Sequence, residues 1–298
     1  MNEIQNLCAP GTKIAEEMIT VSPQVKLRVF TFTSEKKNNN PAVLFVAGWI
    51  TLIKAWENVL KEMTKDFQVF YVETREKISS QVVGKVGYGV EEIGQDIVAL
   101  VDYFNLKDQK YILFGSSLGA TSILESCLYL KTKPLCLVLI GPNAVFRVPR
   151  FGKVIVRVFW PRLYLILKPF IKWYLKNFRL DVKSDYAQYE KYCNNIDAAD
   201  PWKLRKGAIS LSKYEVWDLL GKIEIPTLII GASKDSLHEP TNLFQIVEKM
   251  KKATYLDLET NKLTHSEIMV DEMRVFCSHF DGHFVKVFTL SLYFYLAK

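Results

Sequence analysis

Cysteine is scarce in this 298-residue chain, and its cysteines form no local motif. The five of them stand at positions 8, 127, 136, 193 and 277, without a CxxC pair. A disulfide framework needs an even number, and structural zinc sites place cysteines at short, regular spacings. The pattern therefore argues against both and favours a reducing compartment, so we expect a cytoplasmic location.

Long uncharged apolar runs are also missing. No stretch reaches the roughly 20 residues needed to span a bilayer, and residues 1–11 lack the basic and apolar segments of a signal peptide. Hydrophobic residues make up 49% of the chain and charged residues 24%, as expected of a globular protein with a buried core. We expect a soluble protein or one bound at a membrane surface.

Acidic residues are absent from residues 145–180, which hold nine of the 39 lysines and arginines. The formal net charge is +7, so the rest of the chain carries +7 − 9 = −2. The basic excess is thus local and does not resemble the general basicity of nucleic-acid-binding proteins. We predict no nucleic-acid partner.

Apolar patterning predicts an α/β protein with a mostly parallel, doubly wound sheet, because apolar strand patterns alternate with helical spacing. A hairpin is expected from residues 18–21 and 25–33. Further strands are expected at residues 42–47, 67–72, 111–114, 135–140, 225–231 and 253–258. Helices are expected near residues 56–63, 90–104, 117–130, 241–250 and 267–280.

The alternation stops after Gly141-Pro142 and resumes at residue 225. Residues 143–222 are therefore predicted to form an inserted helical cap between two parts of one core, residues 1–142 and 223–298. Within the last 18 positions, Phe and Leu alternate with Thr, Ser and Tyr from Phe288 to Leu296, which is typical of an amphipathic strand. A short helix or an oligomer contact are the alternatives there.

The segment Gly115-Ser116-Ser117-Leu118-Gly119 follows a predicted strand and opens a predicted helix. This is the setting of a nucleophile elbow, a sharp turn that projects a serine hydroxyl from the carboxyl end of a strand. The helix behind it presents N–H groups to developing negative charge. We predict Ser117 as the nucleophile; the alternative is a chance match in an ordinary strand–helix turn.

A serine hydroxyl needs a base in order to attack, and the chain has four histidines. His279 and His283 fall on or after the last predicted helix and are expected at the surface. His265 follows the strand at 253–258, at the sheet edge where Ser117 is expected, and is the predicted base. The alternative is a solvated loop histidine.

The base in turn needs an acid to orient it. Asp235 comes in the loop directly after the strand at 225–231 and is the predicted acid; a surface aspartate is the alternative. His238, in the same loop, competes with His265 for the role of base. The order Ser117, Asp235, His265 is the chain order of one known triad topology, so the three residues support one another.

Acyl transfer also requires donors for the oxyanion. The N–H of Leu118, next to the nucleophile, is one predicted donor. The other is expected in the loop after the strand at 42–47, and Trp49 N–H is the candidate there. Gly48 permits the tight backbone path that would aim this N–H inward.

These residues resemble the α/β-hydrolase fold family over nearly the whole chain, most of all its lipase, esterase and peroxidase-like branch with a helical cap. The matching segments are Ala47-Gly48-Trp49, Gly115 to Gly119, residues 226–231 with Asp235, and His265. The resemblance implies a triad of Ser117, Asp235 and His265 with Leu118 and Trp49 as oxyanion donors. A serine nucleophile sets aside the aspartate-dependent dehalogenases and epoxide hydrolases of this fold.

Three departures separate the chain from that family. Ala47-Gly48 stands where His-Gly is usual, which removes a side chain that orders the loop. Residues 73–80 replace a glycine-bearing loop, and Thr264 replaces the glycine that commonly precedes the base. Inference of the substrate from better-known members is therefore unsafe.

The basic segment 145–180 sets its cations at helical steps among apolar and aromatic residues, and Pro149, Pro161 and Pro169 are expected to break it into short helices. Such helices suit an anionic membrane surface. The alternative is a lid whose apolar face covers the active site while its cations face water.

The prediction from sequence is a hydrolase that cleaves a small-molecule carboxylic ester, apolar or lipid-like, through an acyl-enzyme on Ser117. No metal or organic cofactor is expected. One alternative is acyl transfer or thioester hydrolysis with the same triad. Another is a catalytically silent member that binds a lipid or a partner, because the loops at Ala47 and at residues 73–80 are altered.

Overall fold

A computed structural model describes residues 2–35, 39–146, 161–180, 182–183, 185–234 and 240–280. Its centre is a nine-stranded sheet in the order β1-β2-β4-β3-β6-β7-β8-β9, with β5 beside β2. The strands are β1 Lys13–Ser22, β2 Val25–Thr33, β3 Ala42–Val46, β4 Val69–Glu73, β5 Gln81–Val82, β6 Tyr111–Ser116, β7 Cys136–Ile140, β8 Thr227–Gly231 and β9 Ala253–Asp257.

The sheet is antiparallel at one edge and parallel across the rest. β1 and β2 form the predicted hairpin, although β1 begins five residues earlier than the sequence predicts, and β2 runs antiparallel to β4. All other neighbours from β4 to β9 are parallel. The predicted mostly parallel α/β sheet is confirmed.

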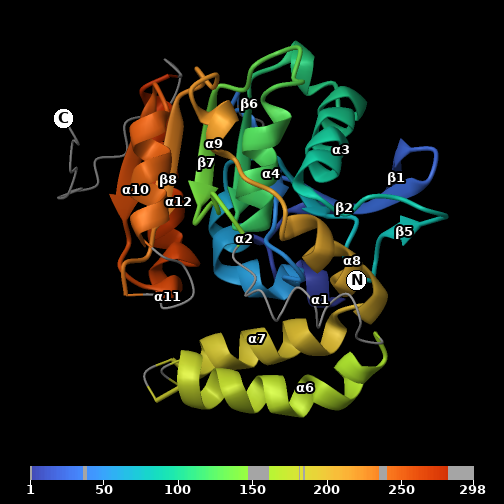
Figure 1. The fold of residues 1–298 in the computed structure, drawn as a ribbon. Coiled ribbons are helices and arrows are strands. Elements are labelled where there is room, and N and C mark those ends of the chain that lie inside the picture. The colour runs from blue at the N-terminus through green and yellow to red at the C-terminus, as the bar shows by residue number, and fades with distance from the viewer. Residues whose placement is uncertain are drawn as a thin grey trace.

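Helices pack on both faces of this sheet (Figure 1). One face is covered by α3 Val90–Tyr103, α4 Leu118–Ser126, α9 Trp217–Leu220 and α10 Pro240–Lys249. The other is covered by the 3₁₀ turn η1 Ile53–Trp56, α2 Glu57–Met63 and α12 Glu267–Ser278, with α1 Asn2–Gln5 at its margin. The helices predicted near 90–104, 241–250 and 267–280 lie within two residues of these bounds, whereas α4 ends four residues before the predicted 130.

Strand β3 shows why this arrangement forms. All five of its residues are buried, and alternate side chains enter the two cores. Phe45 packs edge-on against Trp56 and Phe114, with ring centroids 4.9 and 4.4 Å apart. Burial of such rings contributes about 1.5–3 kcal/mol each and holds the loop after β3 beside the end of β6.

The chain between β7 and β8 forms α6 Leu163–Tyr174, the π-helical turn η3 Leu175–Arg179, α7 Tyr186–Ala198, α8 Pro201–Leu211 and α9. α7 lies between α6 and the main body, and α6 is the outermost helix (Figure 1). The division of the chain into a core and a cap at residues 143–222 remains a prediction. Residues 281–298, with the predicted terminal strand and His283, lie outside the described residues, as does residue 149.

Pro169 does not break the cap segment as the sequence predicts, because it lies inside α6. Proline lacks the N–H that would bond the carbonyl four residues earlier, here that of Leu165. Both residues are exposed, so water can bond this carbonyl and the helix continues. None of the helices in the described part of the chain is long and apolar enough to span a bilayer.

Candidate active site

Ser117 occupies a strained turn between β6 and α4. Its backbone angles are φ 50° and ψ −114°, in a region that costs a non-glycine residue about 1–3 kcal/mol. The turn is held because Ser117 N–H donates to the Ile140 carbonyl of β7 at 2.8 Å, while the Ser117 carbonyl accepts from the N–H of Thr121 at 3.0 Å. The strain places the serine side chain at the carboxyl end of the sheet.

Two glycines allow α4 to approach the sheet this closely. A Cβ on Gly119 would lie 2.1 Å from the Val46 carbonyl oxygen and 2.7 Å from that of Ala47. A Cβ on Gly115 would lie 2.6 Å from Cδ1 of Ile123. Since real Cβ atoms do not come so near backbone oxygens, the G-x-S-x-G spacing is a packing requirement of the turn.

Gly119→Ala should therefore lower the free energy of unfolding by about 3 kcal/mol, because the clash is with backbone that cannot rotate away. Urea unfolding followed by circular dichroism would measure it. Gly221→Ala is the matched control: its Cβ would meet only the Lys249 carbonyl oxygen, at 3.9 Å, and the change should stay below about 1 kcal/mol. Equal stability of the two variants would contradict the packing argument.

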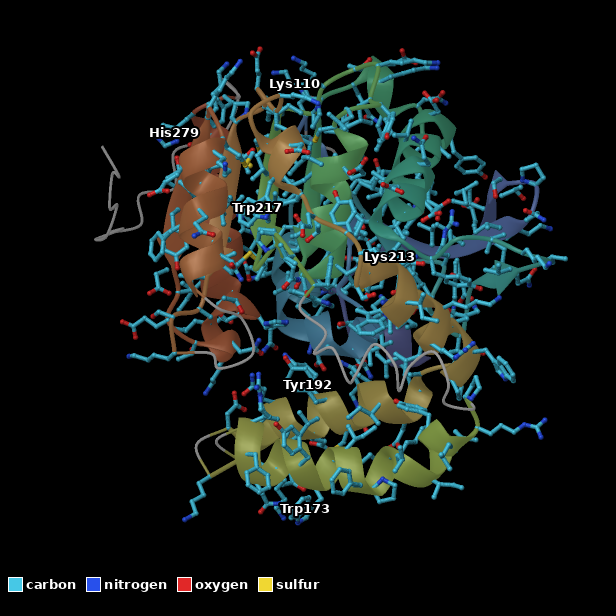
Figure 2. The ribbon with its side chains drawn as sticks, viewed as in Figure 1. Lys110, Trp173, Tyr192, Lys213, Trp217 and His279 are labelled. Carbon is cyan, nitrogen blue, oxygen red and sulfur yellow. The ribbon has the colours of Figure 1, made fainter. Side chains whose placement is uncertain are left out.

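Ser117 and His265 line one cavity of about 340 Å³, together with Trp49. Loops at the carboxyl ends of β3, β6, β7, β8 and β9 form its floor. The opposite wall comes from α7, whose Tyr192 lies on the side facing the sheet (Figure 2). The structure thus brings the predicted nucleophile, base and second oxyanion residue to one site.

His265 is held in a defined orientation. It follows α11 Asn261–Thr264, a short helix in a segment where the sequence predicts a loop. This helix is capped at its start, where the Thr260 side chain accepts the Leu263 N–H at 3.3 Å. The imidazole stacks on Trp56, with ring centroids 4.1 Å apart and planes 22° apart. Its Nδ1 lies 2.9 Å from the Asn261 carbonyl oxygen and 3.0 Å from Oγ1 of Thr264.

These contacts assign the tautomer of the His265 ring. A carbonyl oxygen can only accept, so Nδ1 must carry the proton that it shares with Asn261. In the neutral ring Nε2 then keeps its lone pair, which is the state that a general base requires. Thr264, which replaces the usual glycine, is buried beside Nδ1, where its hydroxyl donates to the same carbonyl at 2.9 Å.

The predicted acid, Asp235, and the competing base, His238, lie outside the described residues. The loop after β8 is described as far as Lys234, whose N–H donates to the Glu259 carbonyl at 2.7 Å. That contact ties the loop to the one between β9 and α11, which leads to His265. The role of Asp235 remains a prediction.

His279 is exposed at the end of α12, as predicted for a surface histidine (Figure 2).

Asn143 is a site residue that the sequence prediction missed. Its Nδ2 donates to Oγ of Ser117 at 3.0 Å, and its backbone N–H donates to Oγ1 of Thr121 at 2.8 Å. An amide nitrogen only donates, so this bond leaves the Ser117 proton available to a base. No local pattern marks Asn143, because its role depends on the neighbouring positions of β6 and β7.

The two predicted oxyanion donors border the nucleophile. Leu118 is the first residue of α4, so its N–H has no acceptor within the helix. Gly48 lies close to the nucleophile, since a Cβ added there would be 3.4 Å from Cβ of Ser117. Trp49, the next residue, lines the same cavity.

Lys77 holds the backbone between Gly48 and Trp49. Its Nζ donates to the Gly48 carbonyl at 2.7 Å, and the same oxygen accepts the N–H of Thr51 at 3.2 Å. In a trans peptide the C=O and the following N–H point in opposite directions. The Trp49 N–H is therefore directed away from Lys77, and its role as an oxyanion donor remains a prediction.

The loop at residues 73–80, which has no glycine, is built around a cluster of buried polar side chains. The side chain of Lys77 is only 4% exposed, and its Nζ also lies 3.1 Å from Oε1 of Glu76. Lys203 of α8 donates to the carbonyls of Lys77 and Ser80, both at 2.6 Å. Burial lowers the pKa of Lys203. Through Lys77, the cluster fixes the loop after β3 at Gly48.

A second buried pair joins Arg75 to α3. Nε and Nη2 of Arg75 donate to the two carboxylate oxygens of Asp96 at 2.7 and 2.6 Å. Burial raises the pKa of Asp96, and Arg75 opposes that rise. Arg75 also donates to the Gly87 and Glu92 carbonyls, so the pair braces α3 and does not touch the oxyanion loop.

Within the described ranges, no group of three or more His, Cys, Asp or Glu residues is arranged to hold a metal ion.

Comparison with solved structures identifies the fold. A hydrolase from Pseudomonas aeruginosa superposes with a TM-score of 0.71 at 16% identity, over 90% of this chain and 98% of that one. A thermophilic esterase from Thermogutta terrifontis gives 0.68 at 19%, over 90% and 96%. A bromoperoxidase from Bacillus anthracis gives 0.68 at 16%, over 88% and 99%. No family model matches the sequence, and no curated protein matches it either.

Proposed function

We propose that this chain, which has the α/β-hydrolase fold, is a serine hydrolase that cleaves a carboxylic ester through an acyl-enzyme on Ser117. The observation that carries the proposal is the strained Ser117 in one cavity with His265, whose Nδ1 is engaged and whose Nε2 is the basic nitrogen. The names of the similar hydrolase and esterase structures agree with this activity.

In the proposed reaction, Nε2 of His265 takes the hydroxyl proton of Ser117 as Oγ attacks the ester carbonyl carbon. The resulting oxyanion accepts hydrogen bonds from the Leu118 and Trp49 N–H groups. Collapse of this intermediate breaks the bond to the alcohol, which leaves with the proton from His265. Water then repeats the sequence and releases the acid. Asp235 is proposed to orient His265 by accepting the Nδ1 proton together with the Asn261 carbonyl.

The cavity favours an apolar acyl group. Its volume of about 340 Å³ is within the usual range for small-molecule sites. Its apolar wall comes from Trp49, Trp56, Ile140, Phe146, Ile230 and Leu243. Lys191 and Asn195 of α7 supply polar groups on the other side. An uncharged acyl group of modest length fits the apolar side of this lining, because burial of a charge there is costly.

Labelling with a fluorophosphonate probe tests the proposal. The native protein should form a covalent adduct, and peptide mapping should place it on Ser117 and not on Ser116. The same preparation should hydrolyse p-nitrophenyl butyrate faster than the corresponding thioester. Folded native protein that takes up no probe would contradict the proposal, and an adduct on another residue would contradict the choice of nucleophile.

A further inference from the structure

The outer face of α6 and η3 is apolar and exposed. Its six large side chains recur at helical spacing and are 43–72% exposed; they are Leu165, Ile166, Phe170, Trp173, Tyr174 and Phe178. Trp173 lies on the side of α6 that faces away from the rest of the molecule (Figure 2). Isolated exposed apolar residues are ordinary, but a continuous apolar stripe marks a contact surface.

The aromatic members of this outer face pack on one another. Phe170 and Trp173 are stacked with centroids 5.5 Å apart, and Phe178 lies 5.4 Å from Trp173 and 5.5 Å from Tyr174. The face is therefore one aromatic surface and not a set of separate side chains. Trp and Tyr are the residues that prefer the boundary between lipid and water.

Polar contacts hold the opposite side of α6 to α7. The Tyr164 hydroxyl donates to the Ile196 carbonyl at 2.8 Å. Nζ of Lys168 donates to the Asp197 carbonyl at 2.7 Å, and Nζ of Lys172 to its carboxylate at 2.6 Å. A lid that merely covers an active site would bury its apolar side and expose its lysines. In α6, Lys168 and Lys172 bond to α7, and the apolar side chains face solvent.

The positive charge around this face indicates which kind of partner binds to it. Residues 162–180 contain no Asp or Glu, and they carry exposed Arg162 just before the apolar stripe and exposed Lys176 within its last turn. A second copy would bring the same cations against its own, whereas an anionic lipid surface pairs with them. We propose that the outer face of α6 and η3 docks on an anionic membrane surface, with its aromatic rings among the lipid headgroups.

Docking in this way would bring the candidate active site close to lipid. α7, which α6 covers, carries Lys191, Tyr192 and Asn195 in the cavity wall. The docking face itself is separate from Ser117 and His265, and its binding needs no catalysis. Membrane association therefore stands or falls independently of the proposed hydrolase activity. The prediction at 145–180 is developed here for residues 162–178. Residues 147–160 lie outside the described residues, and their part in the surface remains a prediction.

Vesicle flotation of the full chain tests this docking. The native protein should float with vesicles that contain phosphatidylglycerol, float much less with pure phosphatidylcholine, and be released by high salt. Phe170→Ser with Trp173→Ser should weaken the partitioning at least about tenfold. Val83→Ser, at a residue 71% exposed elsewhere, should leave it unchanged. Both variants should keep the native circular dichroism spectrum.

Three results would overturn the docking proposal. One is flotation that is equally poor with both kinds of vesicle. Another is equal binding to neutral and anionic vesicles, which would remove the charge argument. The last is a dimer in sedimentation velocity that the Phe170→Ser, Trp173→Ser variant abolishes, because a second copy would then cover the face. Turnover of a water-soluble ester should be the same in the native protein and in this variant.

Discussion

Replacing Ser117 with alanine should lower kcat/KM for a p-nitrophenyl ester by a factor of roughly 10⁴–10⁶, since the covalent step loses its nucleophile. His265→Ala should lower it by a comparable factor, because Ser117 without a base keeps its proton. The double variant should be no slower than either single variant. Groups that act as a unit give such non-additive losses, whereas independent groups multiply their effects.

The structure supplies a control for this series in the same helix. Ser122 lies on α4 with a buried hydroxyl that has no hydrogen-bond partner in the described part of the chain. Ser122→Ala should leave turnover within about twofold of native, because it removes no hydrogen bond. Circular dichroism should show all four variants folded. Retained turnover in Ser117→Ala, or multiplied losses in the double variant, would contradict the paired roles.

The sheet and the elbow could be predicted because their signals are local. Each parallel strand from β3 to β8 is buried on both faces, so it is a short apolar run in the sequence. The ends of the strands are harder to predict, for a physical reason. Phe67 is fully buried and apolar, as a strand residue would be, yet the hydrogen-bonded strand β4 begins only at Val69. Burial and strand pairing are different properties.

The residues that the sequence did not reveal depend on contacts between distant segments. Glu73, Arg75, Glu76 and Lys77 resemble a solvated loop in sequence, because four charges within five residues usually face water. Their burial depends on partners in α3 and α8, which no local pattern records. Likewise, the orientation of α6 depends on Asp197 of α7, which accepts hydrogen bonds from Lys168 and Lys172. These bonds decide whether the apolar side of α6 faces the cavity or solvent.

Lys77→Met should lower kcat by about 10–100-fold while KM changes by less than about twofold. Loss of one oxyanion donor costs about 10²–10³ in kcat, and a misdirected Trp49 N–H should cost a part of that. Methionine keeps the length and the apolar stem of lysine but cannot donate to the Gly48 carbonyl. The peptide that carries the Trp49 N–H then loses its anchor. Steady-state kinetics with one ester separates kcat from KM.

Two further variants separate this positioning role from stability. Lys77→Met alone leaves Glu76 as a buried carboxylate whose Oε2 has no described partner, so Glu76→Gln is added to remove that charge. The double variant should recover stability yet stay slow. Asp96→Asn breaks the other buried pair, which bonds α3 and not the oxyanion loop; it should lower the free energy of unfolding by about 3 kcal/mol and leave kcat unchanged. If kcat instead follows stability across the three variants, Lys77 has only a structural role.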